Sequence, residues 1–156
     1  MVSYHKGDLL QSNCDVICHQ TNCMGAMGAG IARTIRARYP ETYTALRERF
    51  LCDRAKLGKV DIIPVRREDG KELFVVNMYA QKKYMPRGVC HTNYDAFKQC
   101  AEDVKAFCSA HFGEHCKIGF PYKVGCGLAG GDWEIVKNIL ETVFAGPEYD
   151  VEIWEL

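Results

Sequence analysis

Apolar and polar positions follow two periods along the chain, one typical of strands and one typical of helices. Short β-prone runs between turn residues predict six strands, at Val2 to His5, Val16 to Gln20, Lys59 to Val65, Glu72 to Tyr79, Lys117 to Tyr122 and Val151 to Trp154. Apolar residues at helical spacing predict four helices, at Gly28 to Tyr39, Glu41 to about Cys52, Thr92 or Asn93 to about Phe112, and Asp132 to Phe144. Strands that alternate with helices predict an α/β fold.

Two local signals refine this arrangement. The turn Arg66 to Gly70 contains Asp-Gly between two β-prone runs, which predicts an antiparallel hairpin. Pro40 is expected to end the first helix, and in the second helix Tyr43, Leu46 and Phe50 share a face that favours the core. We therefore expect a three-layer α/β/α sandwich with a mixed, mostly parallel central sheet.

Composition is typical of one soluble domain spanning residues 1–156, because 47% of the residues are hydrophobic and 26% are charged. Lys and Arg together number 20, as do Asp and Glu, so the formal net charge is zero. A chain-wide basic surface is absent, which disfavours non-specific nucleic-acid binding, and an anionic ligand would need a local site. No apolar run approaches the roughly 18 to 20 residues that cross a bilayer, and no signal peptide precedes the first strand, so we expect a cytoplasmic protein without membrane partners.

The nine cysteines do not predict a metal site, because their number is odd and no Cys-x-x-Cys pair occurs. We expect reduced and mostly buried thiols. His111-Phe112-Gly113-Glu114-His115 matches a His-x-x-Glu-His metal motif, but Gly113 interrupts it where the helix is expected to end. A solvated helix end is the favoured interpretation, and neither a metal nor a cofactor is expected.

Two glycine-rich stretches each follow a predicted strand and precede a predicted helix, at Thr21 to Ala32 and at Gly125 to Trp133. Glycine allows another molecule to approach the main chain, so such loops can offer N–H groups to an anion such as a diphosphate. In α/β sheets both loops would lie at the carboxyl edge of the strands. The alternative is a pair of tight turns between strand and helix. Neither a dinucleotide fingerprint nor a P-loop is present.

These residues resemble the macrodomains, which bind ADP-ribose and its derivatives. The resemblance spans nearly the whole chain. It is carried by Lys6-Gly7-Asp8-Leu9-Leu10, His19-Gln20-Thr21-Asn22-Cys23, Gly25-Ala26-Met27-Gly28-Ala29-Gly30-Ile31-Ala32, Asn77-Met78-Tyr79-Ala80-Gln81, and Pro121 through Trp133. The pattern is most similar to the small stand-alone branch that contains terminal ADP-ribose protein glycohydrolase and yeast-type ADP-ribose 1″-phosphate phosphatase.

The resemblance implies a ligand-binding role for each matching position. Asp8 would accept a hydrogen bond from the adenine amino group, with Leu9 beside it. The loop from Gly25 to Ile31 would line the distal ribose and pyrophosphate, and Gly125 to Ala129 would wrap the diphosphate from the other side. The implied ligand-binding residues are Asp8, Leu9, Gly25, Met27, Gly28, Ala29, Gly30, Ile31, Tyr79, Gln81, Gly125, Cys126, Gly127, Leu128 and Ala129.

Two departures from the glycohydrolase branch bear on catalysis. That branch has a lysine after the strand that corresponds to Phe74–Tyr79 and an aspartate after Gly-Cys-Gly-Leu, where this chain has Gln81 and Ala129. Lys82 lies one position late, so attack by a lysine on the distal ribose is disfavoured. The Lys and Arg residues between Gln81 and Gly88 predict a solvent-exposed loop.

Three other residues are candidates for catalysis. His19 has an ordinary pKa near 6.5 that suits a general acid or base, and a buried structural histidine is the alternative. Asn22 can orient a water or a ribose hydroxyl, or act as a turn asparagine. Asp132 can take part in the chemistry, or simply cap the helix that follows.

The sequence thus leaves two functions open. One is hydrolysis at the distal ribose of ADP-ribose 1″-phosphate, O-acetyl-ADP-ribose or ADP-ribose on a protein carboxylate. The other is an ADP-ribose reader without turnover. Expected partners are ADP-ribose, its derivatives and ADP-ribosylated protein, whereas nucleic acid is disfavoured.

Overall fold

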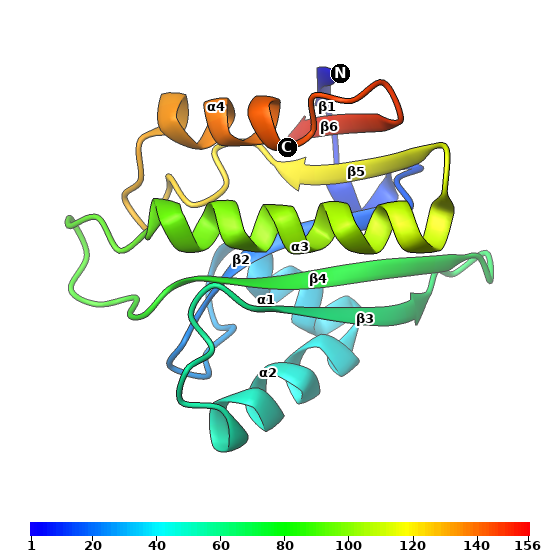
Figure 1. Ribbon diagram of the computed structural model, residues 1–156. Helices are drawn as coiled ribbons and strands as arrows, with labels where there is room; N and C mark the ends of the chain where they lie inside the picture. Colours follow the sequence, from blue (N-terminus) through cyan, green and yellow to red (C-terminus); the bar gives the residue numbers. More distant parts are fainter.

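The computed structural model describes residues 1–156 and centres on one six-stranded sheet with the order β1-β6-β5-β2-β4-β3 (Figure 1). The strands are β1 (Val2–Lys6), β2 (Val16–Asn22), β3 (Val60–Arg66), β4 (Glu72–Gln81), β5 (Cys116–Pro121) and β6 (Tyr149–Glu155). All neighbouring strands are parallel except β3 and β4, which pair antiparallel as the Asp-Gly turn predicts. The sheet is therefore mixed and mostly parallel.

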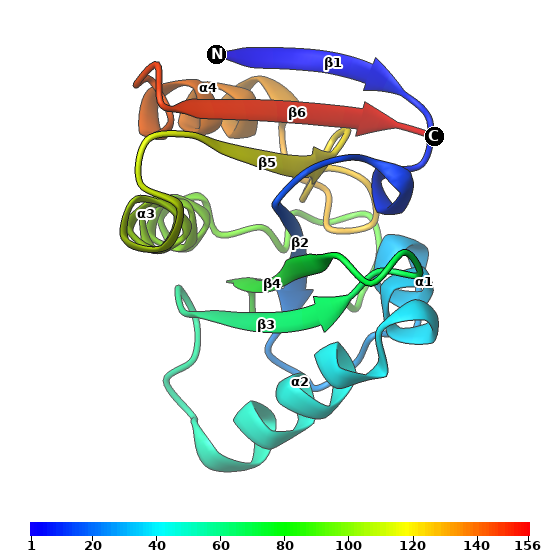
Figure 2. The same ribbon diagram turned by 90° about the vertical axis from the view of Figure 1, so that its right-hand side faces the viewer.

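Helices cover both faces of the sheet. Figure 2 shows α1 (Gly30–Arg38) and α2 (Pro40–Cys52) on one side, with α3 (Tyr94–Phe112) and α4 (Trp133–Val143) on the other. A core of 22 buried residues lies under α3 and α4, and a second core of 13 lies under α1 and α2. Two cores on opposite faces of one sheet are what the strands require, because central parallel strands bury both of their faces.

These observations confirm the predicted three-layer α/β/α fold, with all six strands and all four helices present. The first helix begins two residues later than predicted, because Gly28 and Ala29 belong to the preceding loop. Pro40 ends α1 as expected, but it also begins α2, where its missing N–H is no disadvantage. The single turn of 3₁₀ helix at Leu9–Gln11 is too short to leave a periodic signal in the sequence.

All nine cysteines are free, and five of them are buried. Burial raises the pKa of Cys100 to about 12, which keeps this thiol protonated and unreactive. Gly113 ends α3 with φ +73°, so His111 lies on the helix and His115 lies beyond its end. None of the four helices combines the length and the apolar character needed to span a bilayer.

The chain leaves the middle of the sheet in two directions. From β2 it passes through α1 and α2 to the edge strand β3 and back to β4, whereas from the adjacent β5 it passes through α4 to β6 on the other side. Such a reversal opens a crevice beyond the carboxyl ends of the two strands, where α/β sheets bind ligands.

Candidate functional site

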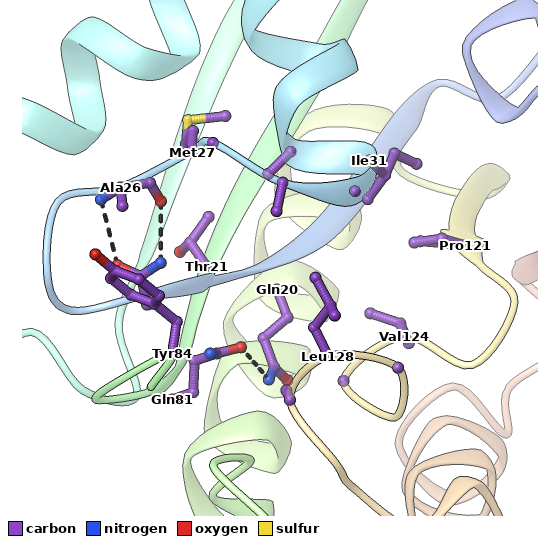
Figure 3. A pocket seen from close by; sticks show the side chains of 18 of the residues that line it. Gln20, Thr21, Ala26, Met27, Ile31, Gln81, Tyr84, Pro121, Val124 and Leu128 are labelled. Carbon is purple, nitrogen blue, oxygen red and sulfur yellow. Dashed lines mark hydrogen bonds between the residues drawn. The ribbon is translucent and has the colours of Figure 1, made fainter. Parts of the chain in front are cut away.

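A cleft of about 820 Å³ lies at the carboxyl ends of β2, β4 and β5 (Figure 3). Both glycine-rich loops line it, the first with Asn22 and Ala26 to Ala32 and the second with Gly125 and Gly127 to Ala129. In Figure 3, Gln81 and Tyr84 lie on one side of the cleft, and Ile31 and Pro121 lie on the other. The two loops that the sequence singles out therefore face one shared cavity.

Backbone N–H groups in both loops are free to bind a ligand. From Met27 to Ala32, across the start of α1, no N–H donates to an acceptor within the chain. The same holds for Gly125, Gly127, Leu128 and Ala129 in the second loop. Unpaired N–H groups that converge from a helix start and a glycine-rich turn form an anion-binding surface.

The charged side chains that line the cleft are all cationic, so they favour an anion as the N–H groups do. Among the lining residues only Arg87 and Lys123 are charged, and neither Asp, Glu nor His occurs there. The cleft thus offers positive charge and hydrogen-bond donors, but no carboxylate or imidazole to act as general acid or base. This combination favours the binding of an anion such as a diphosphate.

Asn22 lines the cleft, and its amide holds the first loop together (Figure 3). Its Oδ1 accepts hydrogen bonds from the N–H groups of Met24 at 2.9 Å and Ala26 at 3.3 Å, and its Nδ2 donates to the Ala26 carbonyl at 3.0 Å. These three bonds are those of a turn asparagine. They place the following segment along the cleft.

Gly25 belongs to the same loop but does not line the cleft. Its φ is +75°, and its carbonyl accepts a hydrogen bond from Arg47 Nη1 at 3.2 Å. A Cβ at this position would lie 2.5 Å from that nitrogen and 3.0 Å from the ring of Phe50. Glycine is therefore required here for packing against α2 rather than for contact with a ligand.

A chain of side-chain hydrogen bonds forms the floor of the cleft. Gln20 Nε2 donates to Gln81 Oε1 at 2.8 Å and to Thr92 Oγ1 at 2.9 Å, and that hydroxyl donates to the Gly125 carbonyl at 2.6 Å. Gln20 Oε1 is buried and has no partner. The floor thus ties the ends of β2 and β4 directly to the second loop.

A bulge in β4 brings Gln81 into this floor. The pairing of β2 with β4 runs from Val16 and Phe74 to Thr21 and Tyr79, and then joins Asn22 to Gln81 with one residue skipped. Bulges re-aim side chains next to functional sites. Lys82, the next residue, is exposed and does not line the cleft, and its carbonyl accepts from the N–H of Cys23.

Three comparisons with known proteins bear on this geometry. No protein-family model matches the chain. The chain is 27% identical over 159 residues to the DNA ADP-ribosyl glycohydrolase of Mycobacterium tuberculosis, covering 99% of this chain but only 42% of that protein. It is also 27% identical to the ADP-ribose 1″-phosphate phosphatase of Scheffersomyces stipitis, over 97% of this chain and 96% of the other.

Solved structures agree with these relatives over the whole chain. The macrodomain of Mycobacterium tuberculosis DarG superposes with a TM-score of 0.83 at 26% identity, covering 99% of this chain and 97% of the other. Thermosipho africanus DarTG in complex with ADP-ribose gives a TM-score of 0.82 at 17% identity, over 99% of this chain and 41% of the other. The chain has the macrodomain fold and is similar in sequence to these relatives over nearly its whole length.

The residues implied for ligand binding fall into two groups. Those that line the cleft are Met27, Gly28, Ala29, Gly30, Ile31, Gln81, Gly125, Gly127, Leu128 and Ala129. Those outside its lining are Asp8, Leu9, Gly25, Tyr79 and Cys126. Asp8 caps the short 3₁₀ helix by accepting from the N–H of Leu10 at 2.9 Å, and Leu9 is buried in the core.

His19 is fully buried in the macrodomain and does not line the cleft. Its Nε2 donates to Asn77 Oδ1 at 2.7 Å, and its Nδ1 has no partner. Burial lowers the pKa of His19 from 6.5 to about 4, so the ring is neutral at neutral pH. The geometry matches the alternative of a structural histidine.

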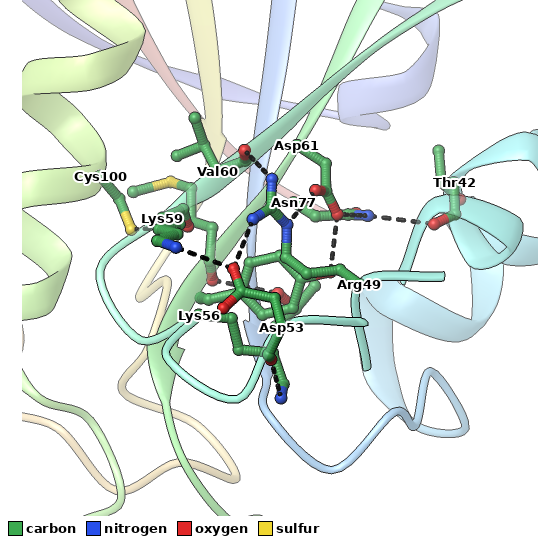
Figure 4. Close-up of polar contacts among 12 residues, drawn as sticks. Thr42, Arg49, Asp53, Lys56, Lys59, Val60, Asp61, Asn77 and Cys100 are labelled. Atoms are coloured by element: carbon green, nitrogen blue, oxygen red, sulfur yellow. Dashed lines mark hydrogen bonds and ion pairs between the residues drawn. The ribbon is translucent and has the colours of Figure 1, made fainter. Parts of the chain in front are cut away.

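Asn77 belongs to a polar network between β4 and α2 (Figure 4). Asp61 accepts from Arg49 Nε at 2.6 Å, from the Tyr79 hydroxyl at 2.6 Å and from Asn77 Nδ2 at 3.3 Å. Burial together with the Asp61 carboxylate raises the pKa of Tyr79 above its ordinary range. Tyr79 therefore belongs to this network and does not line the cleft.

Asp132 also lies outside the lining of the cleft. It is the N-cap of α4, and its Oδ1 accepts from the N–H of Glu134 at 2.9 Å. Its own N–H donates to the Tyr94 hydroxyl at 2.9 Å. The structure thus brings only Asn22 of the three catalytic candidates into the cleft.

Sequence reasoning missed a third wall of the cleft, formed by Tyr84, Met85 and Arg87 in the loop after β4. The remaining lining residues lie in segments that carry the resemblance but were not named individually as ligand-binding residues; they are Gln20, Thr21, Ala26, Ala32, Pro121, Tyr122, Lys123 and Val124. The loop after β4 follows a strand parallel to β2 and so leaves the sheet at the same edge. The parallel order of these strands could therefore have indicated that the loop lines the cleft, whereas its Lys and Arg residues alone suggested only a solvated loop.

Proposed function

We propose that residues 1–156 form one macrodomain that binds ADP-ribose between its two glycine-rich loops and hydrolyses a derivative at the distal ribose. The observation that carries the proposal is the two sets of unpaired N–H groups that face one cavity. As hydrogen-bond donors they match the chemistry of a diphosphate. The names of the mycobacterial and yeast relatives supply the ADP-ribose part of the proposal.

The composition of the cleft constrains the chemistry. No carboxylic acid or imidazole lines the cleft to protonate a leaving group, so the cleft favours a group that leaves as a stable anion. Cleavage of the C1″–O bond of ADP-ribose 1″-phosphate, or of an ester between C1″ and a protein carboxylate, meets this condition. The bonding pair leaves with the phosphate or carboxylate, water adds to C1″, and its proton passes to solvent. The N–H groups of the loops stabilise the developing anion.

A reader of ADP-ribose without turnover is the second candidate. The same observation that limits the chemistry favours it, because a cleft without a general base binds an anion without activating water. Gln81 and Ala129, which stand where the glycohydrolase branch has a lysine and an aspartate, favour it as well.

Calorimetry with ADP-ribose tests binding, and product assays then separate the two candidates. The substrates are ADP-ribose 1″-phosphate, O-acetyl-ADP-ribose and ADP-ribosylated protein with carboxylate linkages. We expect turnover of the first and third, while hydrolysis of the acetyl ester expels an alkoxide and needs an acid that the cleft lacks. With ADP-ribose 1″-phosphate in ¹⁸O-labelled water, the released phosphate should carry no label, because the C1″–O bond breaks.

Each outcome decides one part of the proposal. Absence of ADP-ribose binding refutes both candidates, and binding without turnover of any derivative establishes the reader. Labelled phosphate would show attack at phosphorus and refute the C1″–O mechanism. Gly127→Trp, which fills the cleft from a loop position with open space around its Cα, is the negative control for all assays.

A further inference from the structure

The loop from Lys82 to Cys90, termed here the strap, crosses the cleft between the two glycine-rich loops. At one end the carbonyl of Lys82 accepts from the N–H of Cys23 at 3.0 Å. At the other end the N–H of His91 donates to the carbonyl of Ala129 at 2.7 Å. The strap is therefore fixed to both walls and forms the third side of the cavity.

Contacts within the strap hold its shape. Gln81 Nε2 donates to the Lys83 carbonyl at 2.8 Å, and His91 Nε2 donates to the Pro86 carbonyl at 2.6 Å. A Cβ on Gly130 would lie 2.6 Å from the carbonyl oxygen of Val89, so the second loop packs directly against the strap. The strap is therefore held in place by contacts both before and after Arg87.

Arg87 lines the cleft, and its guanidinium has neither an ion pair nor a hydrogen bond within the chain. Lys123 is the other cation of the lining, and its ammonium lies 5.6 Å from the ring of Tyr122. No carboxylate lines the cavity to neutralise either charge. A guanidinium offers a planar fork of donors that matches a phosphate or carboxylate in two bonds.

The N–H groups of the two loops already account for a diphosphate, which leaves the guanidinium without an assigned ligand. We propose that Arg87 is a specificity-determining residue that binds a further anionic group on the distal ribose, separate from the diphosphate. It follows Tyr84 in the strap, and Tyr84 lies on the Gln81 side of the cleft, across from Pro121 and Ile31 (Figure 3). This inference rests on the proposed function, because it presupposes that ADP-ribose occupies the cleft.

The test compares affinities for ADP-ribose and ADP-ribose 1″-phosphate in the wild type, Arg87→Gln and Arg87→Lys. Loss of a charge-assisted pair at this site should weaken the phosphate derivative about tenfold to one-hundredfold in Arg87→Gln, with the affinity for ADP-ribose within about threefold of the wild type. Arg87→Lys keeps the charge without the fork and should fall between. If the protein hydrolyses ADP-ribose 1″-phosphate, kcat/KM for this substrate is compared among the variants in place of its affinity.

Lys83→Gln is the matched control, because it removes the same charge from the same strap at a position outside the lining of the cleft. It should leave the ratio of the two affinities unchanged. An equal loss for both ligands in Arg87→Gln would assign Arg87 to the diphosphate and overturn the inference, as would no loss for either. A wild type that binds neither ligand would instead refute the proposed function itself.

Discussion

Gly125 is a position where the second glycine-rich loop depends directly on the absence of a side chain. Its φ is +74°, and a Cβ there would lie 2.7 Å from Gln20 Oε1 and 3.2 Å from Thr92 Oγ1. Gly127, two residues further along, has no atom within 4 Å of its Cβ position. Gly125→Ala and Gly127→Ala are therefore a matched pair that adds one methyl group to the same loop.

The expected effects follow from these distances. Alanine in the left-handed region costs about 1 to 2 kcal/mol. Displacing Gln20 also strains or breaks its hydrogen bonds to Gln81 and Thr92, at about 1 kcal/mol each. We expect the free energy of unfolding of Gly125→Ala to fall by about 2 to 4 kcal/mol, whereas that of Gly127→Ala should change by less than about 1 kcal/mol.

Chemical denaturation of both variants measures these differences, and calorimetry with ADP-ribose measures the effect on binding. Because Gln20 lines the cleft, Gly125→Ala should also weaken ADP-ribose at least tenfold. In the double variant Gln20→Ala with Gly125→Ala, the methyl group enters the space that the Gln20 side chain has vacated. The loss of unfolding free energy in the double variant should therefore be smaller than the sum of the losses in the two single variants. Equal stabilities for Gly125→Ala and Gly127→Ala would refute the reasoning.

Three further predictions concern the residues that the sequence nominates for catalysis. Asn22→Ala removes the three hydrogen bonds that hold the first loop and should raise the Kd for ADP-ribose about tenfold; a loss in kcat at saturating substrate with unchanged Kd would instead support a catalytic Asn22. The pKa of His19 is about 4 in the folded state and 6.5 in the unfolded state, so the unfolded state binds more protons between these pH values. The free energy of unfolding should therefore fall as the pH drops from 6.5 to 4, by up to about 3 kcal/mol. Urea denaturation at pH 7 and pH 4.5 should show this fall in the wild type and a smaller one in His19→Gln, and equal falls would contradict it. Asp132→Ala removes the cap of α4 and should cost about 1 kcal/mol of stability, while Asp132→Asn should retain most of it; a larger effect on kcat than on stability would point to chemistry.

The sequence predicted the fold well because the governing signals are local or periodic. Alternating elements, the Asp-Gly turn and the caps at Asn93 and Asp132 all appear as expected. The start of α1 was placed too early because Gly28 continues an apolar pattern while its backbone belongs to the loop. Boundaries of this kind depend on φ values that composition does not specify.

The cleft lies where the backbone of the glycine-rich loops was expected, whereas two of the three side chains considered for catalysis, His19 and Asp132, lie outside its lining. Glycine-rich loops after parallel strands were expected at one edge, and the cleft lies there. The face of β2 that carries His19 could not be deduced, because a strand buried on both faces has no polar alternation to read. The bulge that turns Gln81 toward Gln20 is a pairing irregularity and has no signature in either segment alone.

Residues His19 and Gln20 are neighbours on β2, yet they serve different parts of the molecule. His19 joins Asn77 and, through it, the ion pair of Asp61 with Arg49, which fixes β4 and α2 against the central strand. Gln20 joins the cleft floor and the second glycine-rich loop. Because β4 takes part in both sets of bonds, the buried network holds the strand whose bulge presents Gln81 to the cleft. The network of His19, Asn77, Asp61 and Arg49 therefore supports the site by holding β4 in place. The chemistry of the cleft depends instead on backbone N–H groups and on the strap.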